Sequence, residues 1–515
     1  MIHVKLVTRC TRHLLCECPI GRVEHRTSCA CPIRNHDHLI DGIVRDMTIS
    51  TMSGLLASLT VLVPLLLAFA WMFYTHAPEP YMDEPFHVPQ TQRYCSGLFR
   101  RWDPKITTFP GLYIFGAAHA RGLQLFGSVC LPDQYLPRVQ GCNTTLLRSC
   151  NLVLGVICFV LLRNVYQLLH PGATSAVHTK MAWLVLLFPL HFFFHFLYYT
   201  DVGSLTFVMA SYLACLKHRY KVSALVAGWA VLFRQTNAVW VCFIIGMSVL
   251  KRCLKAKSDK PIPEALPQQL MFAVERAWQM KWVLLADLWA LILVPLIFAA
   301  FVVWNGGIVL GDKAAHTPVR HLMQPLYFVL FIAIALGPFH FSPARLREAL
   351  MGLQQALQGQ PLQTSAKLMG TVGILGLLVN KFTMVHPYLV ADNRHYTFYI
   401  WKDIFARFAA ARYALIPVYA YSGWSIWNIV TAQQSKSCAL LMTLCTVVTL
   451  VPAWLVEFRY FTIPFAMVAL HMQPASASQL RLIIAGYALT NAATVYIFLF
   501  RAFQWPDHSI ARFIW

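Results

Sequence analysis

The chain has 515 residues, of which 58% are hydrophobic, 13% aromatic and only 12% charged. Soluble domains carry about 25% charged residues, so this composition excludes an ordinary soluble domain and indicates a membrane protein. The formal net charge of +21 does not require a nucleic-acid partner, because membrane proteins hold Lys and Arg in cytoplasmic loops and basic patches with interleaved aromatic residues are absent outside the apolar runs.

Residues 1–51 precede the first apolar run and are predicted to be a disordered extension. They contain two cysteine pairs, Cys16 with Cys18 and Cys29 with Cys31, each followed by proline. Paired thiols with nearby histidines can bind zinc, but this spacing fits no standard zinc finger. No metal is therefore predicted, and residues 52–515 are predicted to form a single transmembrane domain.

Apolar runs close to the ~20 residues needed to cross a bilayer recur from residue 54 onward. Two shorter runs, 222–233 and 237–250, flank the polar tetrapeptide RQTN, and a third, 460–472, is ambiguous. The sequence thus predicts an all-α polytopic membrane protein with about 11–13 transmembrane helices. The longer predicted spans are 54–74, 144–168, 180–199, 202–216, 283–304, 322–340, 367–386, 411–431, 438–456 and 482–501.

The segment 75–143 is too polar for one span and too apolar for a free loop. We expect it to be a long first luminal loop with helices lying in the membrane interface. It opens with YMDEPFHVPQ (81–90), in which Asp83 and Glu84 are adjacent carboxylates. It ends at Asn143, which begins the only N-x-Ser/Thr sequon of the chain but adjoins a span, so its glycosylation is not decided.

Orientation follows from the basic stretches LKHRYK (216–221) and KRCLKAKSDK (251–260), which belong in the cytoplasm. When the spans are counted from these cytoplasmic stretches, every polar cluster between the apolar runs falls on the luminal face of the membrane. Because all of them lie on one face, the sequence predicts one luminal site built from several loops. These clusters are YMDEPFHVPQ (81–90), YYTD (198–201), RQTN (234–237), NGGIVLGDKAAH (305–316), HPYLVADNRHYTFYIWKD (386–403) and EFRY (457–460).

The same stretches carry a resemblance to a known family. The chain resembles the dolichyl-phosphate-glucose-dependent α-1,2-glucosyltransferases of the endoplasmic reticulum, which add the third and last glucose to the lipid-linked oligosaccharide used in N-glycosylation. The matching segments span about residues 52–515; ADNRHYTFYIW (391–401) is the most distinctive, and Pro85 departs from the bulky aliphatic residue that the family often has. Longer matches are PYMDEPFHVPQTQRYCSGLFRRWDPKITTFPGLY (80–113), FFFHFLYYTDVGSLT (192–206), FRQTNAVW (233–240), GDKAAHTPVRHLMQPLY (311–327) and EFRYFTIP (457–464).

The resemblance implies a GT-C fold whose first luminal loop bears the catalytic acid. It also implies inverting transfer from a β-linked phosphoryl donor without a metal ion or cofactor, with dolichyl-phosphate-glucose as the lipid co-substrate. The implied partners are that donor, the dolichyl-diphosphate-linked oligosaccharide and endoplasmic-reticulum membrane lipids. The implied location is the endoplasmic-reticulum membrane, with the active site facing the lumen.

Such a transfer needs a carboxylate that accepts the proton of the attacking hydroxyl. Asp83 and Glu84 both lie just past the first span, at the level of lipid headgroups. Asp83 is favoured by analogy with related first-loop acids, but the choice between the two stays open. One of them is expected to be a structural carboxylate, since adjacent side chains usually face different ways.

The leaving phosphate is best stabilised by preorganised cations, and the planar fork of arginine matches phosphate well. The competing interpretation of each cation is an interfacial anchor. The predicted phosphate ligands are, in order of preference, Arg394 with His395, Arg234, and then Lys313 and Arg459. The predicted sugar- and acceptor-binding residues are Asp201, Gln235, Asn237, Asp392, Asn393 and Trp102.

Several of these sugar-binding residues have an equally simple structural interpretation. Asp201 could cap the helix that follows it. Gln235 and Asn237 could satisfy the backbone of a broken helix, and Trp102 could be an interfacial ring.

Two other functions stay open at this point. The first is another lipid-phosphate-sugar transferase, such as a mannosyltransferase, because loop chemistry does not specify the donor hexose. The second is a non-catalytic transporter or channel-associated protein. Outside the tail, no Asp or Glu lies near the middle of a predicted span, which counts against ion-coupled transport. Only the break at RQTN favours transport.

Overall fold

The computed structural model describes residues 36–130, 141–254, 262–314 and 316–515. The chain divides into two compact units, Met1–Met52 and Ser53–Trp515, and the architecture below is that of the second. The predicted disordered extension lies largely outside the described residues, as do the two cysteine pairs of the tail. From residue 36 the chain belongs to helix α1 (His36–His76).

Helices make up nearly all of the regular structure of the second unit. The elements after α1 are α2 (Glu84–Cys95), α3 (Gly111–Cys130), α5 (Thr144–Leu169), α6 (Ser175–Leu186), α7 (Pro189–Phe193), η3 (Phe194–Phe196), α8 (Thr200–Leu216), α9 (Tyr220–Phe233), α10 (Asn237–Cys253), α11 (Leu266–Gln279), α12 (Lys281–Asn305), α13 (Gln324–Ala335), α14 (Gly337–His340), α15 (Pro343–Gly359), α16 (Pro361–Phe382), α17 (Pro387–Ala391), α18 (Tyr396–Tyr399), η4 (Ile400–Ala406), α19 (Ala409–Ala414), α20 (Ile416–Thr431), α21 (Lys436–Leu450), η5 (Phe458–Phe461), α22 (Thr462–His471), α23 (Ala477–Phe500), β1 (Phe503–Gln504) and β2 (Ile510–Ala511).

Long apolar helices confirm the predicted all-α membrane architecture. Within the described ranges, five helices are long and apolar enough to cross a bilayer, or six if one bent pair counts as a span. Several predicted spans are instead helices of 10–17 residues, so the number of 11–13 spans stays a prediction. The five are Ser53–His76, Thr144–Leu169, Lys281–Asn305, Pro361–Phe382 and Ala477–Phe500.

The predicted span 180–199 is not one straight helix. It divides into α6 and the segment Pro189–Phe196, which are bent by 68° relative to each other. Pro189 begins the second segment, and proline kinks or breaks a helix because it lacks the backbone N–H and its ring clashes with the preceding turn. The chain then leaves this segment at Leu197 and enters α8 at Thr200, so that Tyr198 and Tyr199 lie in a short connection beside the first loop.

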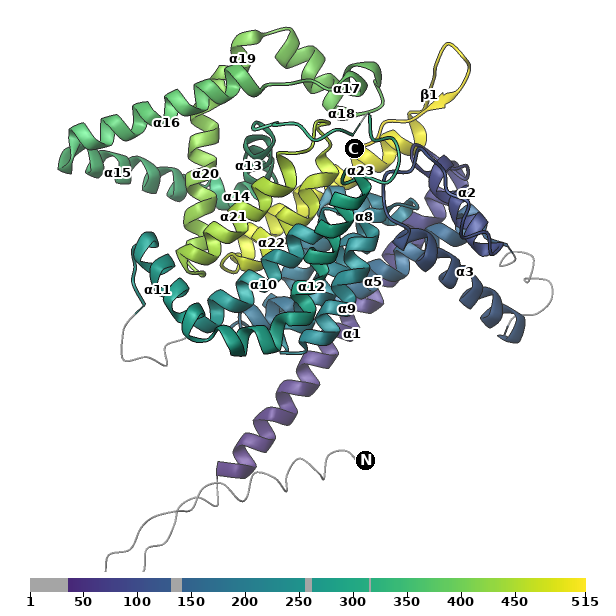
Figure 1. The fold of residues 1–515 in the computed structure, drawn as a ribbon, viewed down its shortest axis with the longest axis horizontal. Helices are drawn as coiled ribbons and strands as arrows, with labels where there is room; N and C mark the ends of the chain where they lie inside the picture. The colour runs from purple at the N-terminus through teal and green to yellow at the C-terminus, as the bar shows by residue number, and fades with distance from the viewer. Residues whose placement is uncertain (1–35, 131–140, 255–261, 315) are drawn as a thin grey trace, which may run out of the picture. The chain divides into compact units, whose positions relative to one another are not determined.

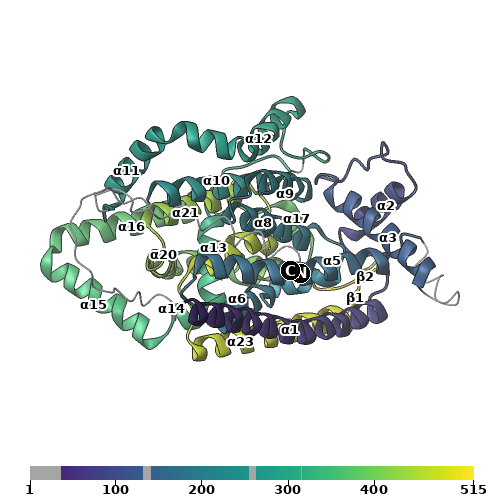
Figure 2. The ribbon, with the colours of Figure 1, turned by 90° about the horizontal axis from the view of Figure 1, so that it is seen from below.

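The first-loop helices and the α15–α16 pair lie on opposite sides of the central helices in both ribbon views (Figures 1 and 2). Between them, α5, α8, α9 and α10 pack around buried aromatic residues such as Trp240 and Tyr212. The chain's first and last long helices are neighbours, because Phe73 of α1 stacks on Phe498 of α23 with ring centroids 5.2 Å apart.

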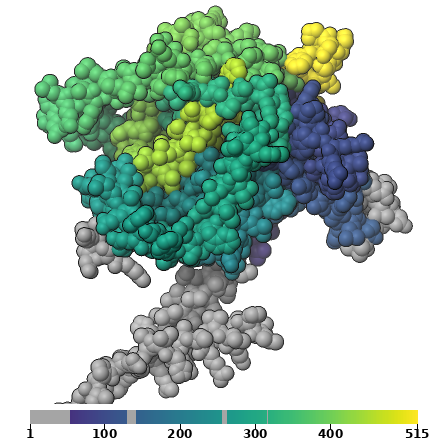
Figure 3. Space-filling model, in the orientation of Figure 1, coloured from purple at the N-terminus to yellow at the C-terminus, as the bar shows by residue number. Residues whose placement is uncertain are grey.

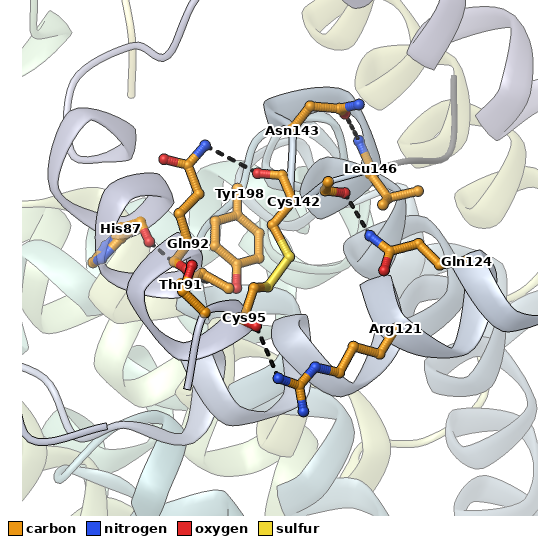
Figure 4. The surroundings of a disulfide bond; sticks show 12 residues. His87, Thr91, Gln92, Cys95, Arg121, Gln124, Cys142, Asn143, Leu146 and Tyr198 are labelled. Atoms are coloured by element: carbon orange, nitrogen blue, oxygen red, sulfur yellow. Dashed lines mark hydrogen bonds between the residues drawn. A yellow bond between two sulfur atoms is a disulfide. The ribbon is translucent and has the colours of Figure 1, made fainter. Parts of the chain in front are cut away.

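A disulfide closes the first loop. Cys95, the last residue of α2, is bonded to Cys142, with 6.6 Å between the two Cα atoms. Three side-chain amide or guanidinium groups brace it: Gln92 donates to the Cys142 carbonyl, Arg121 to that of Cys95, and Gln124 to that of Gly141 (Figure 4).

The sequon asparagine lies next to this disulfide. The Asn143 side-chain oxygen accepts the Leu146 N–H at 2.8 Å and so caps α5, while the residue itself is exposed. The structure therefore gives Asn143 a capping role, and whether it is glycosylated stays undecided.

Candidate active site

The carboxylate of Asp83 lies in the turn between α1 and α2. Asp83 occupies the N-cap position of α2, but its side chain makes no capping hydrogen bond. Its backbone N–H instead donates to the Tyr199 hydroxyl at 3.0 Å, and its carboxylate accepts a hydrogen bond from Arg459 at 3.0 Å. The side chain remains 38% exposed, so a substrate hydroxyl can reach it.

The neighbouring carboxylate, Glu84, is fully buried. Arg148 of α5 holds it with two hydrogen bonds, of 2.8 Å to Oε1 and 2.6 Å to Oε2. The backbone N–H groups of Tyr198 and Tyr81 donate to the same two oxygens. With four donors and no exposed surface, Glu84 has the geometry of a structural anchor. It ties α5 and the 197–199 connection to residues 77–84, which carry both acids and are called the acid turn below.

Helix α5 supplies a second anchor one turn further along. The Asn151 amide donates to the carbonyl oxygens of Leu197 and Tyr199, at 2.6 and 3.0 Å. Arg148 also donates to the carbonyls of Ala77 and Glu79. One helix face thus fixes both the end of α1 and the connection that carries Tyr199, which in turn holds Asp83.

Arg459 is the cation at the centre of the site. It forms ion pairs with Asp83 and Glu457, and its guanidinium lies 5.6 Å from the centre of the Tyr199 ring. Burial alone would lower the pKa of Arg459, but the carboxylates of Glu457, Asp83 and Asp201 raise it well above its ordinary value. The guanidinium therefore stays charged at any physiological pH.

The charge of Arg459 sets the ionisation of Asp83. Burial would raise the pKa of this carboxyl, but Arg459, with smaller contributions from His87 and His395, brings the net pKa below its ordinary value. Asp83 is therefore ionised at neutral pH and available to accept a proton. The pKa of Glu457 is likewise lowered, because Arg459 outweighs the opposing effect of burial.

A second ion pair joins Arg234 to Asp201. The Arg234 guanidinium also lies 5.3 Å from the centre of the ring of Tyr460, the residue that follows Arg459 in the sequence. Asp201 contributes to the raised pKa of Arg459, so the two ion pairs are electrostatic neighbours. The structure thus brings together RQTN, YYTD, EFRY and the first loop, in line with the prediction of one site built from several loops.

The amides beside Arg234 have protein partners. Gln235 donates to the Thr107 carbonyl at 2.5 Å, which ties the break between α9 and α10 to the first loop. Asn237 is fully buried and bonds to the Ser204 hydroxyl and the Ala230 carbonyl. These contacts fit the helix-break interpretation, and a sugar-binding role for either amide stays a prediction.

The ADNRHY motif forms its own cluster. Arg394 donates two hydrogen bonds to the Asp392 carboxylate, at 2.8 and 2.7 Å. His395 Nε2 lies 3.7 Å from the same carboxylate, and the Asn393 side-chain oxygen accepts the Trp505 indole N–H at 3.1 Å. His395 is close enough to the centre to lower the pKa of Asp83, whereas Arg394 is engaged with Asp392 and stays 23% exposed.

Two predicted site residues have other surroundings. Lys313 is exposed and donates to the carbonyl and side-chain oxygens of Asn305. Its loop packs on the first loop, where Leu310 and Asp312 donate backbone N–H groups to carbonyls of residues 107 and 104. The segment after α12 accordingly reaches the purple-blue first loop in Figure 3. The ring of Trp102 packs edge-on against that of Tyr113, with 5.6 Å between the two ring centres.

An apolar pocket adjoins the charged centre. It is lined mainly by aromatic and aliphatic side chains, and two of its lining residues, Phe458 and Thr397, come from the chain segments that carry Arg459 and His395. Its other walls include Tyr327, Phe331, Leu389, Trp401 and Phe405. Cations and an apolar pocket side by side suit a ligand with an anionic head and a hydrocarbon chain.

Sequence reasoning missed several residues that build this site. The role of Arg148 could have been predicted, since an arginine within an apolar run usually has a specific partner. Cys95 and Cys142 both fall in the predicted luminal loop, where disulfides form. The role of residues 503–515 has no comparable signal. Among the described residues no group of three or more His, Cys, Asp or Glu could hold a metal ion; metal-independent action stays a prediction.

Comparison with known proteins identifies the family. Residues 77–470 match the model of the DIE2/ALG10 family. The chain is 38% identical to an Arabidopsis thaliana protein over 85% of its own length and 95% of that relative. It is 37% identical to a Rattus norvegicus protein and 36% identical to a Homo sapiens protein, each over 89% of this chain and 97% of the relative. All three are named Dol-P-Glc:Glc(2)Man(9)GlcNAc(2)-PP-Dol alpha-1,2-glucosyltransferase. No solved structure matches the chain significantly. The chain therefore belongs to the DIE2/ALG10 family of glucosyltransferases.

Proposed function

We propose that this protein transfers glucose in α-1,2 linkage from dolichyl-phosphate-glucose to a diglucosylated dolichyl-diphosphate oligosaccharide, which completes the precursor for N-glycosylation. The relatives' names support this donor and acceptor. The observation that carries the proposal is the partly exposed Asp83 carboxylate, paired with Arg459 in the turn that follows the first span.

Asp83 is the proposed general base. The acceptor hydroxyl oxygen bonds to the anomeric carbon of glucose as the bond from that carbon to the phosphate oxygen breaks. The hydroxyl proton passes to Asp83, and the phosphate oxygen leaves with the electron pair. Attack from the face opposite the leaving group converts a β-linked donor into an α-linked product. Glu84, buried and fully hydrogen-bonded, holds the turn and takes no part in the proton transfer.

The cations around Asp83 are the proposed phosphate ligands. Arg459 is permanently charged, and Arg394 and His395 lie on the neighbouring motif, where the partly exposed Arg394 guanidinium can donate a hydrogen bond to a phosphate oxygen as well as to Asp392. In a site shielded from water, such fixed charges stabilise the developing phosphate monoester. The adjoining apolar pocket is the proposed seat of the first isoprene units of the donor. No metal ion is required by this scheme.

The proposed location is the endoplasmic-reticulum membrane, with the site facing the lumen. The Cys95–Cys142 disulfide supports this orientation, because disulfides persist in oxidising compartments and are rare on the cytosolic side. Asp83 lies in the same loop, so both features point to one side of the membrane.

The test is glucose transfer by the purified protein in lipid nanodiscs, from synthetic dolichyl-phosphate-glucose to a defined diglucosylated acceptor, read by mass spectrometry. Asp83→Asn is expected to lower kcat about 10²–10⁴-fold, the usual contribution of a general base. Glu79→Gln, which removes an exposed carboxylate from the same loop, is the matched control and should retain full activity.

Three outcomes would count against the proposal. Full turnover by Asp83→Asn would remove the assigned base. Transfer from dolichyl-phosphate-mannose in place of the glucose donor would favour a mannosyltransferase. Loss of activity with a chelator, restored by a divalent cation, would overturn the metal-independent scheme.

A further inference from the structure

The last segment of the chain folds back onto the site. After α23 ends at Phe500, strands β1 and β2 form a short antiparallel hairpin that pairs Phe503 with Ala511 and Gln504 with Ile510. The yellow hairpin stands beside the purple-blue first loop in Figures 1 and 3. Residues 512–515 continue from the hairpin toward the ADNRHY motif.

One side of this segment holds the acid turn. The Tyr81 hydroxyl donates to the Arg512 carbonyl and accepts the Arg512 backbone N–H, both at 2.6 Å. The Arg512 guanidinium donates to the carbonyls of Phe498, Leu499 and His76, at 2.8–2.9 Å. Arg512 therefore joins the ends of α1 and α23 and clamps Tyr81, two residues before Asp83.

The other side holds the ADNRHY motif. The Ile514 N–H donates to the Arg394 carbonyl at 2.9 Å. His395 Nδ1 lies 3.2 Å from the Trp515 backbone oxygen. Because that oxygen only accepts, Nδ1 must carry a proton, which leaves Nε2 directed to Asp392 and the site.

Trp505 completes this second contact. Its indole N–H donates to Asn393, and its ring lies 4.6 Å from the Arg394 guanidinium. The Tyr81 ring lies 5.9 Å from the same guanidinium. Arg394 thus sits between an aromatic residue of the acid turn and one of the C-terminal segment.

We infer that residues 505–515 are a positioning element of the active site, in which Trp505 and Arg512 hold the proposed phosphate ligand Arg394 at a fixed place relative to the proposed base. This rests on the proposed function. Tyr81 anchors the base side and Trp505 the phosphate side, so the two contacts should affect different kinetic constants. Neither residue needs to touch the reacting atoms.

Steady-state kinetics of the full-length protein separate the two contacts. Trp505→Leu removes both the indole N–H and the ring, and should raise the KM for dolichyl-phosphate-glucose about tenfold, the effect of losing one half-buried cation–π contact, with a smaller change in kcat. Trp505→Phe keeps the ring and should recover most of this loss. Tyr81→Phe, which loses both hydroxyl bonds, should lower kcat more than it raises KM.

Asp507→Asn is the matched control. Asp507 lies at the exposed hairpin tip and bonds only within it, to Ser509, so its variant should behave like the wild type. If Trp505→Leu lowers kcat at an unchanged donor KM, or leaves both constants unchanged, the segment supports folding only and the inference is overturned.

Hydrogen exchange gives a readout that does not depend on the reaction. In Trp505→Leu, backbone amides of residues 392–398 should exchange faster, while those of α8 should not change. Unchanged exchange at 392–398 would overturn the inference even if the enzyme used another donor. If the wild type fails to transfer glucose but Trp505→Leu still shows faster exchange at 392–398, the proposed function is contradicted and the positioning role stays supported.

Discussion

Asp83 and Glu84 are adjacent in sequence but have opposite surroundings. The Asp83 side chain is 38% exposed and has one cationic partner, whereas that of Glu84 is fully enclosed by donors. Sequence reasoning expects one structural and one functional carboxylate here, and the geometry favours Asp83 for the second role. The catalytic assignment itself stays a prediction that the transfer assay tests.

The rate should depend on pH through Asp83. Its lowered pKa means that the carboxylate is protonated only below the ordinary value of about 4, so kcat/KM should not fall on the acid side until the pH drops below that value. In Arg459→Gln, Asp83 loses the cation that most strongly opposes the effect of burial on its pKa. The pKa of Asp83 therefore rises, and the acid limb of the pH–rate profile should move to higher pH. The measurement is a pH–rate profile of each variant.

Lys313→Gln is the control for this shift, since Lys313 contacts Asn305 and not Asp83. Its profile should keep the acid limb of the wild type, whatever its absolute rate. An acid limb that stays in place in Arg459→Gln would show that another group limits the rate.

The buried Glu84–Arg148 pair should matter for stability. Removing one partner leaves an unpaired buried charge, a change that typically destabilises by about 3–5 kcal/mol. Arg148→Met should therefore unfold at clearly lower temperature, and the double variant Arg148→Met/Glu84→Gln should recover part of the loss. Asp83→Asn, at a partly exposed position, should change the unfolding temperature little. Thermal unfolding in detergent measures all three, and equal losses for Asp83→Asn and Arg148→Met would contradict the division of roles.

At the scale of elements, the apolar runs predict most helices but not how they are divided or joined. The runs at 144–168 and 482–501 become the single helices α5 and α23, because their apolar length matches the bilayer. The run at 180–199 is broken at Pro189, and proline alone does not reveal the size of the bend. Grouping the polar loops on one face is predictable from charge, whereas the pairing of Asp83 with Arg459 joins residues 376 positions apart and has no local signal.

The disulfide links the end of α2 to the start of α5. A cross-link over 47 residues stabilises by about 4 kcal/mol if it acts only by restricting the unfolded chain. Because Gln92, Arg121 and Gln124 brace the same junction (Figure 4), the folded loop should survive its loss but unfold at lower temperature. Cys95→Ser and Cys142→Ser should each lower the unfolding temperature, and their double variant should lower it no further.

Cys242→Ser is the control for the disulfide, because Cys242 is an exposed free cysteine. Its unfolding temperature should match that of the wild type. A reductant should lower the unfolding temperature of the wild type but not that of Cys95→Ser. The same unfolding temperature for wild type and Cys95→Ser would contradict a stabilising cross-link.

At the scale of the whole molecule, the charged site and the basic stretch LKHRYK (216–221) lie at opposite ends of α8. Helix α8 begins at Thr200, beside Asp201, and ends at Leu216, beside the basic stretch LKHRYK. Its 17 residues span roughly 25 Å at 1.5 Å per residue. This length is close to the ~30 Å thickness of the hydrocarbon core of a bilayer, so we expect the two ends of α8 to face different compartments and the loops that carry Asp83 and Arg394 to share one.

Cysteine labelling in sealed microsomes tests this arrangement. Glu79→Cys and Asp403→Cys place thiols at exposed positions next to the acid turn and the ADNRHY motif, and Lys217→Cys places one at the opposite end of α8. A membrane-impermeant maleimide should label Lys217→Cys in intact vesicles. It should label the other two only after permeabilisation, because positive loops face the cytoplasm. The unsubstituted protein provides the background signal of its native cysteines. If Glu79→Cys and Asp403→Cys were labelled from different sides, Asp83 and Arg394 could not serve one substrate, and the site described above would not exist in the membrane.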